Sequence, residues 1–387
     1  MTGGVEAILS AQANSLRAAG HDVRVLAGRG DAELIPELDS RHPEVESLAR
    51  ALAAGDDVSE RFVKLQVRLR AVLSERLSDR ELVLVHNVMT MPFNLPATAA
   101  LADLAFPKVA WTHDLAWVNH RYAAYQRPGW PTSLLRVPQA RTTYVAISEV
   151  RRGEICSVLG LPADRVPLVP NGIDAAQVLT LGRHLLQLAA ALGFSDADPL
   201  IVVPVRITRR KRLELALAAA AILRRREPSL RLVVTGPLGP HSGDNLDYWR
   251  YLERLRTQLG LEAVVSFLHE QSQPQAPHPI SRQDVFELYR LADVILLPSE
   301  SEGFGLPILE AALARAPLVC ADLPVLRELG TGNFTFPPAA SAEVVAETLA
   351  RALSSPAARG RRHVLRTYAW PGVIRATERV MEQVIGG

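Results

Sequence analysis

Short apolar runs alternate with longer amphipathic stretches along most of this chain, in two successive series. The runs of the first series are His21–Ala27, Leu82–Val85, Lys108–Thr112, Thr143–Ile147 and Val166–Val169. Those of the second series are Leu200–Ile207, Leu230–Thr235, Val264–Leu268, Val294–Pro298, Pro317–Cys320 and Phe334–Phe336. Such alternation is typical of buried parallel strands joined by helices that cover the faces of a sheet. The pattern predicts an α/β protein with two parallel sheets.

The two series are joined by the segment Val169-Pro-Asn-Gly-Ile-Asp174. Asn-Gly after a proline is a strong turn signal, and a turn that joins two sheets can act as a hinge. An ordinary surface loop would have the same composition. The residues alone leave both interpretations open.

Composition narrows the class of protein. The 387 residues are 48% hydrophobic, which is enough core material for two or three domains. A net charge of +2 gives no overall field for binding nucleic acid. Two cysteines, Cys156 and Cys320, suit a reducing compartment and form no metal-binding motif. The chain start lacks the features of a signal peptide and no apolar run reaches the ~18 residues of a membrane span, so we expect a soluble, cytoplasmic protein.

The strongest chemical signal is the segment Glu302-Gly-Phe-Gly-Leu-Pro-Ile-Leu-Glu310, which follows a predicted strand. Pro307 suits the first position of a helix, so the preceding turn lies at a helix amino end. That turn consists of Gly303, Phe304, Gly305 and Leu306. Its N–H groups would be unpaired and directed at a ligand, which suits phosphate oxygens. Glu310 is expected in the first helical turn, where its carboxylate can accept hydrogen bonds from two neighbouring sugar hydroxyls.

A simpler explanation exists for each part of this segment. Glu310 could merely complement the helix dipole, Glu302 could be a solvated loop acid, and the glycines could only form a turn. The combination of strand, glycine turn, proline and two acids favours a ligand site. The segment resembles the E-x7-E signature of the retaining glycosyltransferases of family four, which have the GT-B architecture. The resemblance implies two Rossmann-like domains that face each other across a cleft.

A second candidate group lies in the basic segment Arg206-Ile-Thr-Arg-Arg-Lys-Arg212, at the end of a predicted strand. Ligands of open α/β sheets bind at the carboxyl ends of strands, where Arg206 and Lys211 could stabilise a departing diphosphate without a divalent metal. The alternative is a solvated basic loop, which is preferred for the other three arginines. The resemblance favours Arg206 and Lys211 as site residues, since the family has an arginine at this strand end and a lysine five residues later. Val205 and Arg212 stand where the family often has glycine.

The segment Trp111-Thr-His-Asp114 places an imidazole and a carboxylate at a strand end in the first half. His113 could shuttle a proton or bind a sugar hydroxyl, although a lone histidine at a strand end is more often structural. Its likeness to the family's strand–Thr–His–Asp pattern implies that His113 lies beside the donor sugar. His86 and Asn87 end another strand in the same way, towards the acceptor side.

Further likenesses define the expected domains. The segment Val265-Ser-Phe-Leu-His-Glu270 resembles the one whose backbone and apolar side chains, here Leu268, hold the nucleobase in the family. Trp370 matches the aromatic residue at which the last helix of such enzymes returns to the first domain. The resemblance implies an acceptor-side domain at 1–172, a nucleotide-sugar domain at 173–366 and a returning helix at 367–387.

The start of the chain departs from the family. Gly3-Gly4-Val5-Glu6 resembles the turn that follows the first strand and lies against donor and acceptor, which makes Gly4 a candidate donor-binding residue. Only two residues precede Gly3, so the first strand is missing and we expect the natural chain to begin upstream of Met1. Loss of an interior strand would leave buried backbone groups unpaired, at about 1–3 kcal/mol each. Direct pairing of His21–Ala27 with Leu82–Val85 would contradict this expectation.

The resemblance implies retaining transfer of a hexosyl group from a nucleoside-diphosphate sugar to a hydroxyl acceptor, with no metal or other cofactor. The catalytic candidates are Glu302, His113, Arg206 and Lys211. The donor base and sugar, the acceptor and the oligomeric state are not predicted, and peripheral contact with the inner membrane face stays open because many relatives glycosylate lipids. The alternatives are a GT-B-like epimerase or phosphorylase and a non-catalytic sugar-nucleotide-binding protein. No lysine segment resembles a pyridoxal phosphate site, and the presence of Glu302, His113 and Lys211 favours catalysis.

Overall fold

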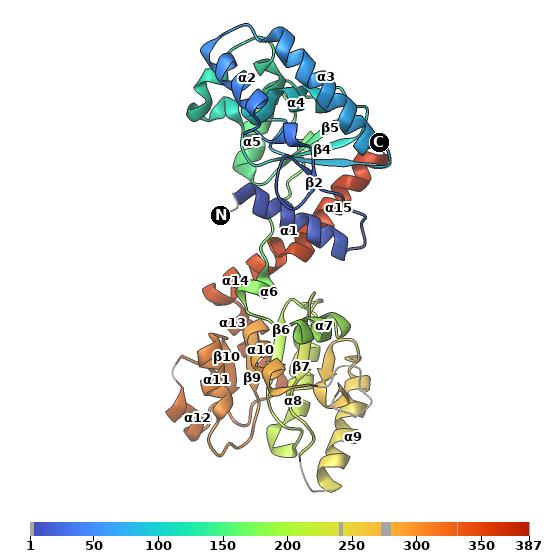
Figure 1. Ribbon diagram of the computed structural model, residues 1–387. Coiled ribbons are helices and arrows are strands. Elements are labelled where there is room, and N and C mark those ends of the chain that lie inside the picture. Colours follow the sequence, from blue (N-terminus) through green and yellow to red (C-terminus); the bar gives the residue numbers. More distant parts are fainter. Residues whose placement is uncertain (1–3, 240–242, 272–279, 331, 387) are drawn as a thin grey trace. The chain divides into compact units, whose positions relative to one another are not determined.

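The computed structural model describes residues 4–239, 243–271, 280–330 and 332–386 (Figure 1). Its internal contacts divide the chain into two units. The first unit is Met1–Ile173 together with Thr367–Gly387, and the second unit is Asp174–Arg366. Each has its own sheet and its own apolar core. None of the helices in the described ranges is long and apolar enough to cross a membrane.

The sheet of the first unit has three parallel strands in the order β3-β4-β5. Their bounds are β3 Val83–His86, β4 Lys108–Thr112 and β5 Thr142–Ala146. The middle strand is buried along its whole length, because helices cover both of its faces. Pairing continues past β5 only as an isolated parallel bridge between Ala146 and Leu168, so the run predicted at Val166–Val169 does not form a full strand.

The helices of the first unit lie on both faces of this sheet (Figure 1). One layer consists of α2 Pro43–Ala54, α3 Ser59–Arg76, α4 Leu95–Ala102 and α5 Glu149–Leu159. The other consists of α1 Gly4–Ala18 and α15 Trp370–Gly386, which pack against each other. Helix α15 is fixed at its start, where the Trp370 ring leaves no space for a Cβ at Gly172 and the Ile173 N–H donates to the Tyr368 carbonyl at 2.7 Å.

The strand predicted at His21–Ala27 forms only in part. Strand β1 is Leu26–Ala27 and pairs in parallel with β2, Glu33–Leu34, rather than with β3. Within the residues that the structure describes, no strand pairs with the outer edge of β3. The direct pairing of His21–Ala27 with Leu82–Val85 is therefore not found.

The sheet of the second unit has six parallel strands in the order β8-β7-β6-β9-β10-β11. Their bounds are β6 Leu200–Val203, β7 Arg231–Val234, β8 Val265–Phe267, β9 Val294–Leu297, β10 Leu318–Ala321 and β11 Phe334–Phe336. Each of the six runs predicted for this half contains a strand, although Leu200–Ile207 is a strand only over its first four residues. The inner strands β6, β9 and β10 are continuous apolar segments buried on both faces, which stand out in the sequence. Taken in chain order, the arrangement is the 3-2-1-4-5-6 order of Rossmann sheets.

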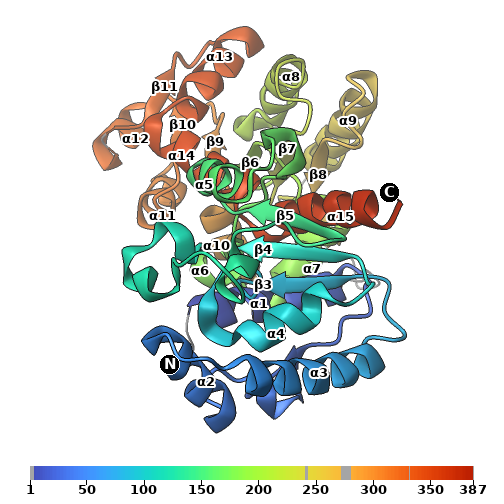
Figure 2. The same ribbon diagram turned by 90° about the horizontal axis from the view of Figure 1, so that it is seen from above.

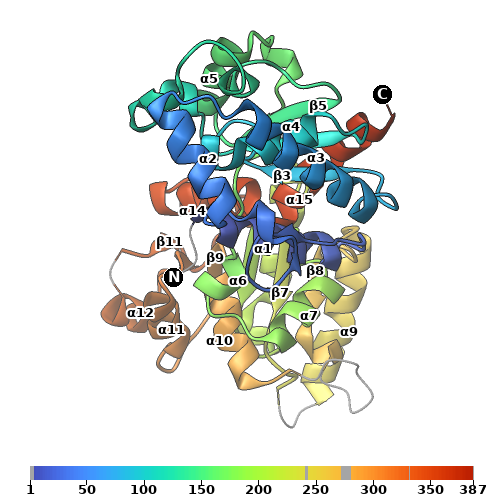
Figure 3. The ribbon, with the colours of Figure 1, turned by 45° about the horizontal axis from the view of Figure 1, so that its top comes forward.

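Two helical layers cover this sheet (Figure 2). One contains α8 Leu213–Leu223 between α9 Gly243–Gln258 and α13 Ala342–Leu353. The other contains α10 Arg282–Leu291, which packs against α7 Arg183–Ala191 and α11 Leu306–Ala314. Helix α12, Pro324–Leu329, lies beside α11 (Figure 3). The remaining helices of the unit are α6 Ala175–Val178 and α14 Pro356–Thr367. Both units are Rossmann-like α/β folds.

Candidate functional site

The order of the strands marks one place in the second sheet for a ligand. Strands β6 and β9 are neighbours, with Ile201 opposite Val294, although the α-helices α8, α9 and α10 and the strands β7 and β8 come between them in the chain. The connections that leave β6 and β9 go to opposite faces, and a crevice forms where two such connections diverge. The segment with Arg206 and Lys211 follows β6, and the turn with Glu302 follows β9. The strand order thus brings both candidate groups to the same switch point.

Lys211 and Glu302 form an ion pair at this switch point. The Lys211 Nζ lies 2.5 Å from Glu302 Oε1, and the two side chains are only 9% and 8% exposed. The Ser299 hydroxyl donates to the same carboxylate oxygen at 2.6 Å. Burial lowers the pKa of Lys211, and the carboxylate of Glu302 opposes that shift. The two predicted catalytic residues are therefore in direct contact.

Two further hydrogen bonds join the loops after β6 and β9. The Glu300 N–H donates to the Arg210 carbonyl at 2.8 Å, and the Arg210 guanidinium donates to the Ser301 carbonyl at 3.1 Å. Arg212 follows Lys211 with a φ of +49°, in the left-handed region that favours glycine. Glycine, the residue that the family often has at this position, takes such a conformation without strain.

The turn before α11 presents unpaired donors. In the described part of the chain, no hydrogen bond takes up the N–H of Gly303, Phe304, Gly305 or Leu306. Gly305 has a φ of +99°, and a Cβ there would lie 2.6 Å from Leu326 Cδ2. Helix α11 begins at Leu306, so Pro307 occupies the second position rather than the predicted first. Four free N–H groups at a helix amino end form a favourable place for an anion.

Glu310 is held by a residue of the neighbouring helix. The hydroxyl of Tyr289, in α10, donates to Glu310 Oε2 at 2.7 Å. Tyr289 is 1% exposed, and burial raises the pKa of its phenol. The prediction that Glu310 lies in the first turn of α11 is wrong, because it is the fifth residue and begins the second turn.

The other candidates of the second unit differ in exposure. Arg206 is exposed, and among the described residues it has no ion pair, so its guanidinium is available to a ligand. Leu268 directly follows β8, and its side chain is completely buried in the core. It can therefore face a nucleobase only through its main chain.

His113 and Gly4 belong to the first unit. His113 follows β4, is 7% exposed, and has its ring Nε2 3.2 Å from His86 Nδ1. Burial lowers the pKa of His113 to about 4, so the ring is neutral near pH 7. Asp114 accepts a hydrogen bond from Arg151 at 3.1 Å. Gly4 is the first residue of α1 rather than part of a turn after a strand, and Gly3 lies outside the described residues.

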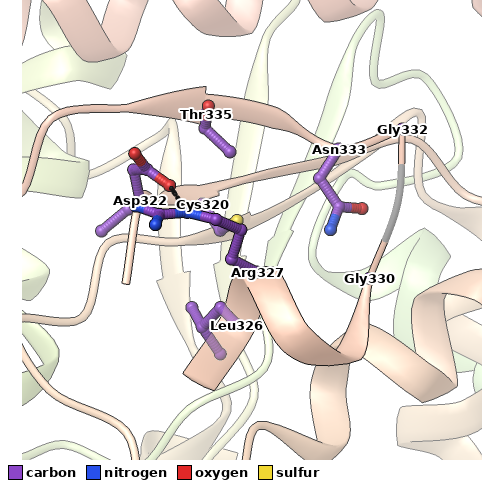
Figure 4. A pocket seen from close by; sticks show the side chains of 9 residues that line it. Cys320, Asp322, Leu326, Arg327, Gly330, Gly332, Asn333 and Thr335 are labelled. Carbon is purple, nitrogen blue, oxygen red and sulfur yellow. Dashed lines mark hydrogen bonds and ion pairs between the residues drawn. The ribbon is translucent and has the colours of Figure 1, made fainter. Parts of the chain in front are cut away.

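A hollow in the second unit contains none of the predicted site residues. It has a volume of about 270 Å³ and lies between β10, α12 and β11 (Figure 4). Asp322 and Arg327 form an ion pair in its wall at 2.9 Å, near Asn333 and the buried Cys320. Its Leu326 is also the side chain against which Gly305 packs.

No metal site is evident in the described ranges, since no group of three or more His, Cys, Asp or Glu residues could hold an ion there. Asp198 of the sequence Asp196-Ala-Asp198 pairs with Arg362 at 2.6 Å. This pairing gives the Asp198 carboxylate a structural partner within the second unit. Metal independence stays a prediction.

Two family models match this chain, and together they span most of it. The model described as "Glycosyltransferase Family 4" matches residues 2–177. The model described as "Glycosyl transferases group 1" matches residues 187–369. The chain belongs to glycosyltransferase family 4.

Curated relatives of this family 4 glycosyltransferase include proteins named D-inositol 3-phosphate glycosyltransferase. The one from Frankia alni is 33% identical over 236 residues, which are 60% of this chain and 55% of the relative. The one from Saccharomonospora viridis is 31% identical over 278 residues, which are 68% of this chain and 62% of the relative. The chain thus spans little more than half the length of these relatives. A solved glycosyltransferase from Rickettsia africae is 15% identical, with a TM-score of 0.38 over 99% of this chain and 96% of the other.

Three side-chain contacts of this family 4 glycosyltransferase were not predicted from the sequence. Tyr289, Ser299 and Asn87 each bind a candidate residue or its backbone. Ser299 comes directly after the predicted strand Val294–Pro298, three residues before Glu302, so its position gave a usable signal. Tyr289 lies on another helix, and the sequence contains no signal for its contact with Glu310.

Proposed function

We propose that this family 4 glycosyltransferase transfers a hexosyl group from a nucleoside-diphosphate sugar to a hydroxyl acceptor, with retention of configuration and without a metal. The observation that carries the proposal is the convergence at the β6–β9 switch point. Lys211 and Arg206 on one side, and four unpaired N–H groups on the other, offer positive charge and donors for a diphosphate. A departing diphosphate needs this kind of stabilisation.

The ion pair suggests how a donor is received. Lys211 would exchange its carboxylate partner for a phosphate oxygen of the donor, while the exposed Arg206 binds the diphosphate from outside. Glu302, released from the ammonium but still held by Ser299 and by Arg210 at 3.8 Å, would accept hydrogen bonds from the hydroxyls of the transferred sugar. The negative charge that develops on the leaving group is thus matched by fixed cations.

Other candidates bind the donor at its two ends. Glu310, held by Tyr289, would accept hydrogen bonds from the ribose hydroxyls. The main chain at Leu268 would contact the base. His113, neutral near pH 7, would bind a sugar hydroxyl. The acceptor hydroxyl would attack from the face that the diphosphate leaves, with a leaving-group oxygen as base, which accounts for retention.

A ligand panel tests the binding part of this proposal. Thermal unfolding is measured with UDP, GDP and ADP, each with EDTA and again with Mg²⁺. We expect one nucleotide to raise the midpoint by several degrees, equally with and without the metal. A shift that requires Mg²⁺ would contradict metal independence, and no shift with any nucleotide would contradict the proposed donor class.

The acceptor and the stereochemistry need a transfer assay. The matching nucleotide sugar is incubated with a panel of hydroxyl acceptors that includes inositol phosphate, the substrate in the names of the relatives. NMR of the product reports its anomeric configuration, and retention is expected. Donor binding without product for any acceptor would support the alternative, a non-catalytic sugar-nucleotide-binding protein.

A further inference from the structure

The turn after β4, which contains His113, is hydrogen-bonded to the buried side-chain amide of Asn87, directly after β3. Asn87 is 8% exposed, and its Oδ1 accepts the N–H of His113 at 2.8 Å and the N–H of Asp114 at 3.1 Å. The Asn87 N–H donates to the Trp111 carbonyl at 3.0 Å. The Thr90 hydroxyl donates to the Asp114 carbonyl at 2.7 Å. The backbone on both sides of His113 is therefore set by residues 87–90.

Asn87 also has an unusual backbone conformation. Its φ is +63°, in the left-handed region that asparagine tolerates better than most residues. This conformation turns the chain sharply after His86 and lets the Asn87 side chain reach the next strand end. A buried N–H group that has no acceptor destabilises the fold. Because the N–H groups of His113 and Asp114 share Asn87 Oδ1 as their acceptor, this oxygen determines the shape of the turn.

The ring of His113 has its own partner. His86 Nδ1 lies 3.2 Å from His113 Nε2, and the two rings are inclined by only 24°. Burial lowers the pKa of His86 to about 3 and that of His113 to about 4, so both rings are neutral near pH 7. Between two neutral imidazoles one nitrogen must donate and the other accept. The contact holds the orientation of the His113 ring. The other ring nitrogen, Nδ1, lies 3.5 Å from Asn171 Nδ2, an amide donor, so Nδ1 accepts and the proton of His113 lies on Nε2, directed at His86 Nδ1.

We propose that His86 and Asn87 are positioning residues for His113: Asn87 fixes its backbone and His86 fixes its ring for the sugar. The inference rests on the proposed function, because it concerns how His113 meets the donor. A purely structural pair would stabilise the fold without affecting the tautomer of His113. The two roles therefore make different predictions.

Three variants separate these roles. His86→Phe keeps a flat ring beside Trp111, whose ring centroid lies 6.0 Å away, but removes the nitrogen. His86→Asn restores a polar atom close to the place of Nδ1. Asn87→Gly keeps the left-handed turn without strain but removes the acceptor of both N–H groups. Circular dichroism and thermal unfolding show that each variant is folded before it is compared.

The first readout is the ¹⁵N NMR spectrum of the His113 imidazole, assigned with His113→Gln and independent of any substrate. We expect one neutral tautomer in the unchanged protein, a mixture of tautomers in His86→Phe, and partial recovery in His86→Asn. The second readout is transfer, for which we expect kcat to fall about tenfold to hundredfold in His86→Phe and Asn87→Gly with little change in donor KM. Unchanged His113 signals in both variants would overturn the inference. If the unchanged protein makes no product, the proposed function fails, while the NMR result still decides whether His86 and Asn87 position His113.

Discussion

Lys211 and Glu302 lie 91 residues apart in the chain, yet the Nζ of one is 2.5 Å from the carboxylate of the other. Neighbouring strands β6 and β9 create this proximity by ending side by side at the switch point. The pair joins a cation expected to bind phosphate to an acid expected to bind sugar. The contribution of this ion pair to stability and to turnover can be tested by substitution.

Breaking the pair should destabilise the protein. Lys211→Met leaves the Glu302 carboxylate without its ammonium partner, and we expect the free energy of unfolding to fall by about 1–3 kcal/mol. Adding Glu302→Gln to that variant should recover part of the loss, because it removes a buried carboxylate whose remaining cation is the exposed Arg210 at 3.8 Å. Urea denaturation measures both effects. The exposed pair of Lys64 and Glu60 is the control, and Lys64→Met should change stability by less than about 1 kcal/mol.

The turn before α11 should depend on Gly305 and not on Gly303. Gly305→Ala forces a side chain into the left-handed region and towards Leu326, so we expect a loss of roughly 1–2 kcal/mol or more. A Cβ at Gly303 meets open space, and Gly303→Ala should leave stability within about 0.5 kcal/mol. Equal effects of the two substitutions on the unfolding midpoint would argue against the described turn.

Removal of the Tyr289 hydroxyl should weaken donor binding with little effect on the fold. Tyr289→Phe keeps the buried ring but leaves Glu310 free to rotate away from the ribose. We expect the thermal shift produced by the matching nucleotide to shrink, while the unfolding midpoint of the free protein changes by only a few degrees. Tyr251→Phe, on an exposed ring of α9, serves as the control. If the nucleotide raises the unfolding midpoint of Tyr289→Phe as much as that of the unchanged protein, the contact of Tyr289 with Glu310 does not contribute to donor binding.

Stability should fall in mild acid because of His86 and His113, which lie in a partly or fully buried pair. The pKa values of His86 and His113 are about 3 and about 4 in the folded state, below the ordinary value near 6.5. As pH falls below about 6.5, the unfolded chain takes up protons that the folded chain does not, so the free energy of unfolding decreases by up to about 1.4 kcal/mol per pH unit for each ring. His86→Phe should show a shallower decrease between pH 6.5 and 5 in urea denaturation. An identical slope in the two proteins would contradict a His86 that stays neutral in the folded state.

The sequence predicted the second sheet more completely than the first. Its central strands are unbroken apolar runs such as Val294–Leu297, buried on both faces, whereas His21–Ala27 is a mixed segment that forms a strand only at its last two residues. Motif resemblance supplied Glu302, Glu310 and Lys211 without their contacts. The pairing of Lys211 with Glu302 requires the strand order, which no local pattern contains. The contact of Tyr289 with Glu310 requires the packing of two helices, and that of Asn87 with His113 requires a left-handed turn after β3.

Turnover of a labelled nucleotide sugar tests the central claim most directly. The rate of transfer is compared in the unchanged protein, Glu302→Ala and Lys211→Ala, after circular dichroism has shown that both variants are folded. We predict clear turnover by the unchanged protein and a loss of about a hundredfold or more in each variant, since removal of one stabilising group from a reaction centre costs this much. Wild-type rates in both folded variants would contradict the assignment of the β6–β9 switch point as the reaction site.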